Sequence, residues 1–351
     1  MDFALTDEQR MIADTARQFF TENATSERTR RAMGADGFDR DTWRAYCEEL
    51  GFGGLALPEA FGGAALGMVE FASVAEAAGA QVAAIPMLGQ AMAGAAILAG
   101  GEDAARQRWL PAIASGRTVV AAAESDTLDF ADGRLSGAID FVPDGAVADL
   151  LLLFGAGGAW LVRADAPGVT VSARTTMDQT RPLASVALDA AAAEPLADGC
   201  AAADAARRSG WICLAAEALG GAQACLDRTV AYARERVQFG RPIGSFQAYK
   251  HRLADMMVDI EQARSALYWA ACAVDEGSAD AAFALHAAKS FCADTGFRCA
   301  ADMIQLHGGI GFTWEHDAHL FFKRARSIQT LLGSGNWHRE QAARMILGDT
   351  A

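Results

Sequence analysis

The sequence predicts a mainly α-helical protein with a small β domain in its middle. Long Ala-rich segments with helical periodicity occupy both ends of the chain, and short β-prone runs lie between them. Turn dipeptides such as Asp132-Gly133 and Pro167-Gly168 separate those runs. We therefore expect a helical domain over 1–115, a β domain over 116–200 and a helical bundle over 201–351.

The first domain shows clear helix signals. Thr6 can cap the first helix, and Gln9, three residues later, completes a capping box. Positions at helical spacing follow, namely Met11, Ile12, Thr15 and Phe19. Another helix is expected over 41–50. The most apolar window, 80–100, predicts a buried helix that begins after Pro86 rather than a membrane span, because Pro, Gly and Gln interrupt it.

The middle domain predicts a small antiparallel sheet or barrel. Its β-prone runs are Leu135–Val142, Asp149–Phe154, Ala159–Arg163 and Gly168–Ser172. In the third domain, long amphipathic segments with short connections predict an antiparallel four-helix bundle. The expected helices lie near 204–236, 245–276, 279–306 and 324–347.

Bulk composition excludes several classes of protein. With 351 residues, 52% hydrophobic and 21% charged, the chain is typical of a folded globular protein. A formal net charge of −14 argues against nucleic acid as a partner, because no excess of Lys and Arg exists to neutralise phosphates. The seven cysteines form no CxxC pair and the N-terminus lacks a signal-peptide pattern, so we expect reduced thiols and a cytoplasmic protein without a membrane span.

The segment Arg236-Val-Gln-Phe-Gly-Arg-Pro-Ile-Gly-Ser-Phe-Gln247 carries the most specific signal. Arg234 and Arg236 complement the negative end of a helix, and Gly240 with Pro242 would stop it, so a purely structural interpretation is available. A second segment, Gln305-Leu-His-Gly-Gly-Ile-Gly-Phe312, contains a glycine pair whose amides can approach a phosphate closely. Alone, that pair is a weak signal and is more typical of a plain turn.

Together the two segments resemble the signatures of acyl-CoA dehydrogenases, and the resemblance covers the whole chain. It implies FAD as cofactor, with Arg236 at the pyrophosphate, Phe239 packed on the cofactor, and Gln305, Gly308 and Gly309 at the ADP half of a neighbouring subunit's FAD. The remaining cofactor-binding positions that the resemblance implies are Gln238, Ile243, Phe246, Gln247, Ser334 and Asn336.

The sequence departs from the family where the family has its catalytic base. That chemistry needs a carboxylate to remove the α-proton while the β-hydrogen leaves as hydride to the flavin. Leu332 occupies the usual Glu position, and Gly210 occupies the alternative one. Glu217, two helical turns beyond Gly210, is a weak substitute that is better explained as a buried structural acid. Catalytic residues and metal ligands are therefore not assigned.

The β domain is altered as well. The family's flavin-contacting Thr-Glu-Pro stretch appears only as Ala123-Glu-Ser-Asp126, and the Trp-Ile-Thr stretch is replaced by Asp140-Phe-Val-Pro143. These losses resemble the short, base-less subunits of bacterial α₂β₂ acyl-CoA dehydrogenases that act on steroid side chains. The resemblance implies a longer partner subunit that carries the catalytic Glu, an acyl-CoA substrate, and an electron acceptor like electron-transfer flavoprotein.

Two alternatives remain open from the sequence. One is a homo-oligomeric acyl-CoA dehydrogenase with an unusual base. The other, from a different class, is a scaffold that keeps the fold and binds no flavin. The persistence of Arg236, Phe239, Gln247, Gln305 and Gly308 as a set favours a cofactor-binding subunit over the scaffold.

Overall fold

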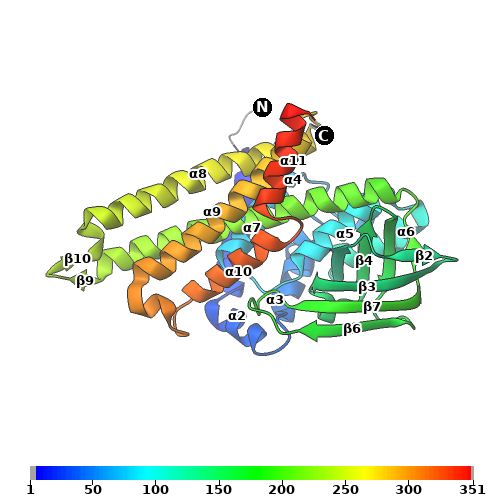
Figure 1. Cartoon of the computed structure of the whole chain (residues 1–351), viewed down its shortest axis with the longest axis horizontal. Helices are drawn as coiled ribbons and strands as arrows, with labels where there is room; N and C mark the ends of the chain where they lie inside the picture. Colours follow the sequence, from blue (N-terminus) through cyan, green and yellow to red (C-terminus); the bar gives the residue numbers. More distant parts are fainter. Residues whose placement is uncertain (1–4, 349–351) are drawn as a thin grey trace. The chain divides into compact units, whose positions relative to one another are not determined.

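The computed structural model of this chain describes residues 5–348. The predicted fold class is confirmed, because helices precede and follow a region of strands (Figure 1). The α-helices are α1 (Asp7–Asn23), α2 (Ser26–Met33), α3 (Arg40–Arg44), α4 (Met68–Ala80), α5 (Met87–Gly100), α6 (Asp103–Ala114), α7 (Gly199–Glu235), α8 (Gln247–Asp275), α9 (Ala281–His307), α10 (Ala318–Thr330) and α11 (Gly335–Leu347).

The chain divides into two compact units. One comprises the described parts of 1–26, 68–83 and 214–351, and the other comprises 27–67 and 84–213. The helical unit thus draws on both ends of the chain. The domain boundaries expected near 115 and 200 follow secondary structure along the sequence and stay predictions. Within residues 5–348, no helix is both long and apolar enough to cross a membrane.

The capping box of α1 is confirmed. The Thr6 hydroxyl accepts from the Gln9 amide at 3.2 Å, and the Gln9 side chain accepts from the Thr6 amide at 2.9 Å. The helix predicted from the spacing of Met11, Ile12, Thr15 and Phe19 is confirmed, although Met11 is 63% exposed and Thr15 is exposed. The buried face consists of Ala13, Ala16, Phe19 and Phe20. Small alanines on that face allow α1 to pack on α4.

The helix expected over 41–50 is present but changes type along its length. It begins as α3 and continues as a π-helical turn over Ala45–Glu49. The helix expected after Pro86 is confirmed as α5, which begins at Met87 and is largely buried.

The β region consists of two four-stranded sheets. Their strand orders are β1-β4-β5-β8 and β2-β3-β7-β6, and their facing side chains share one apolar core. The strands are β1 (Val120–Glu124), β2 (Asp129–Ala131), β3 (Arg134–Pro143), β4 (Leu150–Gly155), β5 (Gly158–Arg163), β6 (Val169–Arg174), β7 (Leu183–Ala192) and β8 (Glu194–Pro195). These sheets pack face to face without closing into a barrel. The pairing of β1 with β4 is parallel, unlike the antiparallel pairing expected.

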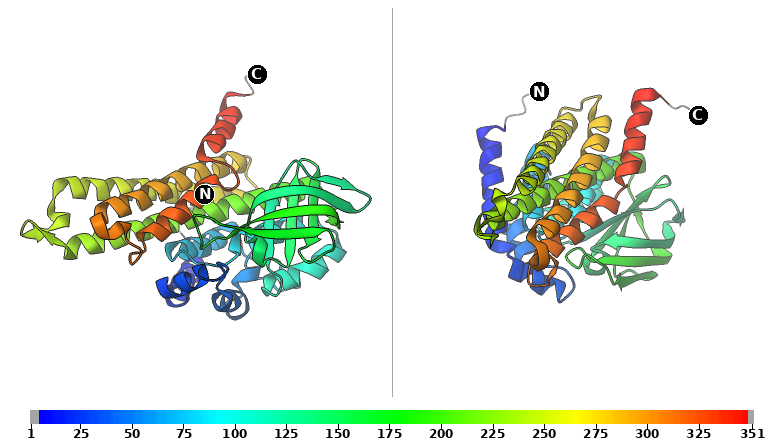
Figure 2. Two further views of the ribbon diagram at one scale, coloured as in Figure 1. Left: turned by 60° about the horizontal axis from the view of Figure 1, so that its bottom comes forward. Right: turned by 60° about the vertical axis from the view of Figure 1, so that its left-hand side comes forward.

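The helical unit contains the expected bundle, formed by α8, α9, α10 and the second part of α7 (Figure 1). The single helix predicted over 324–347 is wrong, because it is broken into α10 and α11. Leu332 and Gly333 have φ angles of 52° and 101°, and Ser334 caps α11 by accepting from the Trp337 amide at 3.3 Å. A left-handed pair followed by a new N-cap changes the direction of the chain, so α11 runs at an angle to the bundle helices (Figure 2).

Candidate flavin-binding end of the bundle

The first motif forms a hairpin at the end of α7. Strands β9 (Val237–Gln238) and β10 (Arg241–Pro242) pair around Phe239 and Gly240, whose φ angles are 53° and 76°. Two consecutive positive φ values are characteristic of a tight hairpin turn, and a Phe pays a steric penalty to adopt one. The Phe239 side chain is 92% exposed at this tip. Strain and exposure of an aromatic residue together indicate a binding function.

A second aromatic residue lies beside the hairpin. Phe246 meets Phe239 edge to face, with ring centroids 6.2 Å apart. The Arg241 guanidinium lies over the Phe246 ring at 4.0 Å from its centroid, and the Ile243 amide closes the hairpin by donating to the Arg236 carbonyl at 2.8 Å. The hairpin therefore presents a shaped aromatic surface that includes Ile243 and Gln247, the latter at the start of α8.

The second motif follows the end of α9. Gly308 has φ 62° and ψ −140°, a conformation open to glycine alone among the common residues. A side chain placed on Gly308 or Gly309 would meet no atom within 4 Å, so both backbone segments face open space. Gln305 is exposed one turn earlier on α9. A ligand can therefore approach this backbone closely.

Two tyrosines bring the motifs to the same end of the bundle. Tyr232, one turn before Arg236, stacks on His307 with ring centroids 4.5 Å apart. The Tyr249 hydroxyl, in the first turn of α8, donates to the Leu306 carbonyl at 2.9 Å. Burial raises the pKa of Tyr249 to about 12, so its hydroxyl remains a donor at neutral pH. Sequence reasoning missed both tyrosines: they flank the first motif, and the sequence holds no signal for their contacts with the second.

Among the residues that the structure describes, this end of the bundle exposes an arginine without an ion pair and several apolar side chains. No ion pair of Arg236 is recorded within residues 5–348, and its side chain is exposed. The nearby apolar side chains of Val237, Ile310 and Phe312 are 52%, 46% and 87% exposed. Exposed aromatic surface next to an unpaired guanidinium is suited to an anionic, aromatic ligand or to a partner chain that carries one.

The structure does not bring Ser334 and Asn336 to this end. They lie at the α10–α11 junction, where Ser334 caps α11 and the Asn336 side chain accepts from Arg339 at 2.6 Å. Arg339 pairs with Asp294 in the middle of α9. With a rise of ~1.5 Å per residue along α9, that position is roughly 20 Å from His307. The two groups of predicted cofactor residues are therefore separate within this chain.

The two positions expected for a base hold no proton acceptor. Leu332 is half-buried, and its carbonyl lies 3.1 Å from His338 Nε2. Gly210 is buried within α7. Glu217 is only 3% exposed, and its carboxylate lies 3.7 Å from the guanidinium of Arg324, which also donates to the Ala83 carbonyl. A buried, charge-paired Glu is suited to holding helices together.

The two segments of the β region that differ from the family pattern, 123–126 and 140–143, differ in their contacts. Glu124 pairs with Arg207 at 2.7 Å, and the Asp126 carboxylate accepts from the Ala156 amide at 2.8 Å. Phe141, in the segment that replaces the family's Trp-Ile-Thr, is 65% exposed with φ 61°. It lies where the pairing of β3 with β7 shifts register. A bulge in a strand re-aims the side chain that it carries.

Comparisons with known proteins identify the family of this chain. Residues 6–117 match the model of the acyl-CoA dehydrogenase N-terminal domain, and 197–347 match that of its C-terminal domain. Over 342 residues the chain is 36% identical to "Acyl-CoA dehydrogenase IpdE2" of Mycolicibacterium smegmatis, covering 97% of this chain and 98% of that protein. The chain belongs to the acyl-CoA dehydrogenase family.

Two solved structures that resemble this acyl-CoA dehydrogenase chain are named for two different chains. The structure of the ChsE4-ChsE5 complex from Mycobacterium tuberculosis matches with a TM-score of 0.92 and 29% identity, covering 100% of both chains. The Tcur3481-Tcur3483 steroid acyl-CoA dehydrogenase, a G363A variant, matches with a TM-score of 0.87 and 32% identity, over 97% of this chain and 98% of that one. The similarity therefore includes steroid-type acyl-CoA dehydrogenase subunits, as expected from the motifs.

Proposed function

We propose that this acyl-CoA dehydrogenase chain is the base-less, half-site subunit of an α₂β₂ FAD-dependent complex that desaturates acyl-CoA thioesters with bulky, steroid-type acyl groups. A longer partner subunit supplies the catalytic Glu, and an acceptor like electron-transfer flavoprotein removes the electrons. The observation that carries the proposal is an end of the bundle with an exposed Arg236, an exposed Phe239 and open backbone at Gly308, in a chain whose base positions are Leu332 and Gly210.

The bundle end fits the adenine dinucleotide part of FAD. Arg236 offers an exposed guanidinium that can form charge-assisted bonds to the pyrophosphate, and Gly308 with Gly309 offers open backbone beside it. Gln238, Gln247 and Gln305 are exposed amides that can donate and accept. The Phe239 and Phe246 rings supply an aromatic surface for the cofactor.

Chemistry at the thioester would depend on the partner. When bound, FAD accepts the β-hydrogen of the acyl group as hydride. Proton removal from the α-carbon requires a base within hydrogen-bond reach, and the side chains at Leu332 and Gly210 cannot provide one. The role left to this chain is to bind and orient the dinucleotide, with Ser334 and Asn336 proposed to contribute polar contacts at a second place.

The homo-oligomeric alternative would need Glu217 as base. Its carboxylate is 3% exposed and is held by Arg324. Both solved relatives described above are named for two chains rather than one. These observations support a heteromeric assembly over a self-sufficient enzyme.

Co-expression tests the proposal. The chain purified alone should carry little FAD, whereas co-expression with a longer homologue should give a yellow complex with flavin absorbance in proportion to the partner. The matched control is the partner expressed alone, which should also bind FAD weakly. Stoichiometric FAD in the isolated chain would favour the homo-oligomeric enzyme, and a colourless but stable complex would favour the scaffold.

A further inference from the structure

The helical unit contains a large cavity away from the proposed FAD site. It has a volume of about 980 Å³ and is lined by α1, α4, α7 and α8. Its α7 residues run from Gly220 to Arg228, which precede Arg236 by roughly 12–24 Å along the helix at ~1.5 Å per residue. None of the residues assigned to FAD above lines it.

A close crossing of α4 and α7 forms one side of this cavity. A side chain on Gly220 would contact the Glu76 carbonyl, and one on Gly79 would contact the Glu217 carbonyl. Backbones that approach this closely leave no room for side chains between them. The neighbouring helices α1 and α8 flank the crossing and enclose the space beside it.

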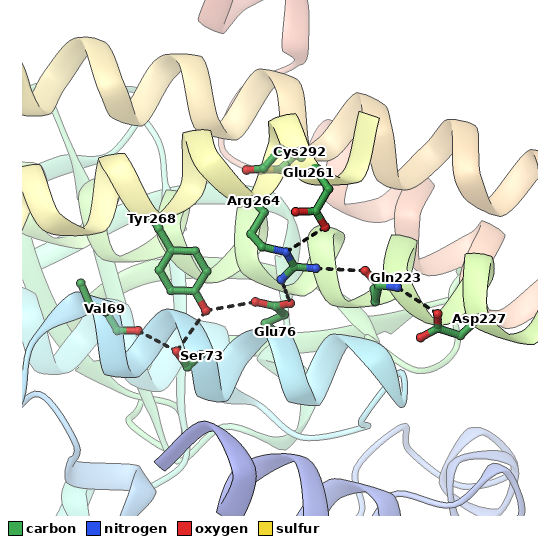
Figure 3. Close-up of polar contacts among 10 residues, drawn as sticks. Val69, Ser73, Glu76, Gln223, Asp227, Glu261, Arg264, Tyr268 and Cys292 are labelled. Atoms are coloured by element: carbon green, nitrogen blue, oxygen red, sulfur yellow. Dashed lines mark hydrogen bonds and ion pairs between the residues drawn. The ribbon is translucent and has the colours of Figure 1, made fainter. Parts of the chain in front are cut away.

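A continuous row of polar side chains, which we call the polar row, follows the cavity wall (Figure 3). Its members come from α4, α8 and α7 in the order Ser73, Tyr268, Glu76, Arg264, Gln223 and Asp227. Tyr268 lies 3.1 Å from Ser73 and donates to Glu76 at 3.2 Å. Arg264 bonds to Glu76 and, at 3.0 Å, to Gln223, which donates to Asp227 at 2.9 Å.

Each arginine along this cavity has a carboxylate partner. Arg264 pairs with Glu76, Arg228 with Asp317 at 3.2 Å, and Arg17 with Asp14 at 2.7 Å. A phosphate or carboxylate would therefore find no uncompensated positive charge among them. Hydrogen-bonding capacity remains, because the bonds of Arg264 to Glu76, Gln223 and Glu261 use three of its five N–H donors.

Much of the remaining lining is apolar, although Arg17, Thr21, Gln81, Arg228 and Ser265 also border the cavity. The apolar part includes Ala77, Ala80, Ala224, Ala266 and the ring of Trp269. Small-molecule sites in proteins are commonly clefts of roughly 300–1,000 Å³ with apolar walls and a few placed polar groups, and they occur between bundle helices. The polar row and the apolar side chains of the remaining wall match that description.

We propose that this cavity binds an uncharged small molecule with an apolar body and hydroxyl or carbonyl groups along one edge. Those groups meet the polar row, where Tyr268, Glu76 and Arg264 provide both donors and acceptors. The apolar body lies against the alanines and Trp269. The site is separate from the FAD end, so it would be a second ligand site of this chain.

A matched pair of probes tests this chemistry. Testosterone is uncharged with one hydroxyl and one carbonyl, and testosterone sulfate has the same rings with an anionic group. Isothermal titration of the full chain should give saturable, one-to-one binding of testosterone, and at least tenfold weaker binding of the sulfate. Equal or tighter binding of the sulfate, or no saturable binding of testosterone up to its solubility limit, would overturn the proposal.

Cavity-filling variants locate the binding. Ala224→Phe and Ala266→Phe place a ring inside the cavity, whereas Ala231→Phe and Ala254→Phe add the same ring at exposed positions of the same two helices. We expect at least tenfold weaker testosterone binding in the first pair and no change in the second. Unchanged binding in the first pair, with the fold intact by circular dichroism, would show that the probe binds elsewhere and would refute the assignment.

The polar row needs its own variant. Tyr268→Phe removes one hydroxyl and keeps the ring, so testosterone binding should weaken about 2- to 10-fold. Unchanged binding would remove the polar row from the proposal and contradict it. The FAD content of the co-expressed complex is measured on the same variants and should stay unchanged. Loss of probe binding with normal FAD separates this site from the proposed flavin function, which can therefore fail or hold independently.

Discussion

Tyr232 stacks on His307 with 20° between the ring planes, and this contact joins the two halves of the candidate flavin site. Tyr232 belongs to the last turns of α7, and His307 is the final residue of α9 before Gly308. Burial lowers the pKa of His307, so its imidazole is neutral near pH 7 and stacks without the cost of burying a charge. The geometry between Arg236 and Gly308 thus depends on a side-chain pair that need not touch the cofactor.

Breaking this stack should weaken FAD binding indirectly. In Tyr232→Leu, the hairpin loses an aromatic contact worth roughly 0.5–1.5 kcal/mol beyond its buried area. We expect FAD affinity of the complex to fall about 2- to 10-fold, measured by flavin fluorescence on dilution. Phe283→Leu is the control, since it removes the Phe283–Trp269 ring contact between α8 and α9 far from the site. Equal effects of both variants would contradict a positioning role for Tyr232.

Removing the direct contacts should have a larger effect. Arg236→Ala deletes a charge-assisted bond to phosphate worth roughly 1.5–3 kcal/mol, and Gln305→Ala deletes an amide contact. The double variant should lose FAD from the complex while circular dichroism and assembly stay unchanged. Arg234→Ala serves as the control because it removes a neighbouring exposed arginine of α7. Normal flavin content in the double variant would show that both residues have only a structural role at the ends of their helices.

Much of the fold was predictable because local signals agreed with tertiary structure. The Thr6–Gln9 capping box, the start of α5 after Pro86 and the runs that became β3 to β6 each have a strong short-range cause. The short strands β2 and β8 were missed, and so were the strands β1 and β7. Both β1 and β7 are rich in alanine, which favours helices, and they become strands only through pairing with β4, β3 and β6.

The candidate site likewise has parts that the sequence predicted and parts that it did not. Family motifs pointed to Arg236 and Gly308, but spacing could not show that Tyr232 and Tyr249 join them, since side-chain contacts between helices have no sequence period. The break at Leu332 was missed because Leu is a good helix former and rarely adopts a positive φ. Buried Lys289, which donates to the Ile328 carbonyl at 3.0 Å, supports the end of α10 there.

The lowered pKa of buried Lys289 should make the free energy of unfolding depend on pH above neutrality. Burial lowers its pKa from 10.5 to about 8, so the charged form is disfavoured in the folded state. Between about pH 8 and 10.5 the unfolded chain binds a proton that the folded chain does not, and the free energy of unfolding therefore rises with pH. Relative to Lys289→Met, the wild-type chain should gain up to ~3 kcal/mol across this window.

Urea titrations at a series of pH values measure this difference directly. Lys250→Met provides the control, because Lys250 is exposed and its removal should leave the pH dependence parallel to wild type. Parallel curves for wild type and Lys289→Met would mean that the buried amine does not titrate in this range.

Glu217 distinguishes a structural acid from a hidden base. Replacing Glu217 by Gln leaves the buried Arg324 charge without its carboxylate, which should cost roughly 3–5 kcal/mol of stability. Turnover per folded complex should nevertheless stay within a few-fold of wild type, because Glu217 lies ~10 Å along α7 from the position of Gly210. Removing the partner's Glu should instead abolish turnover. The assay is reduction of an artificial electron acceptor with a bulky acyl-CoA.

A double variant separates the two effects. In Glu217→Gln with Arg324→Met, the uncompensated charge is gone, so much of the lost stability should return while turnover stays near wild type. A general base contributes about 10²–10⁴-fold to the rate, well beyond the few-fold change that a structural acid allows. A hundredfold loss in both variants at normal flavin content would make Glu217 catalytic, and the chain would then be an enzyme with its own base.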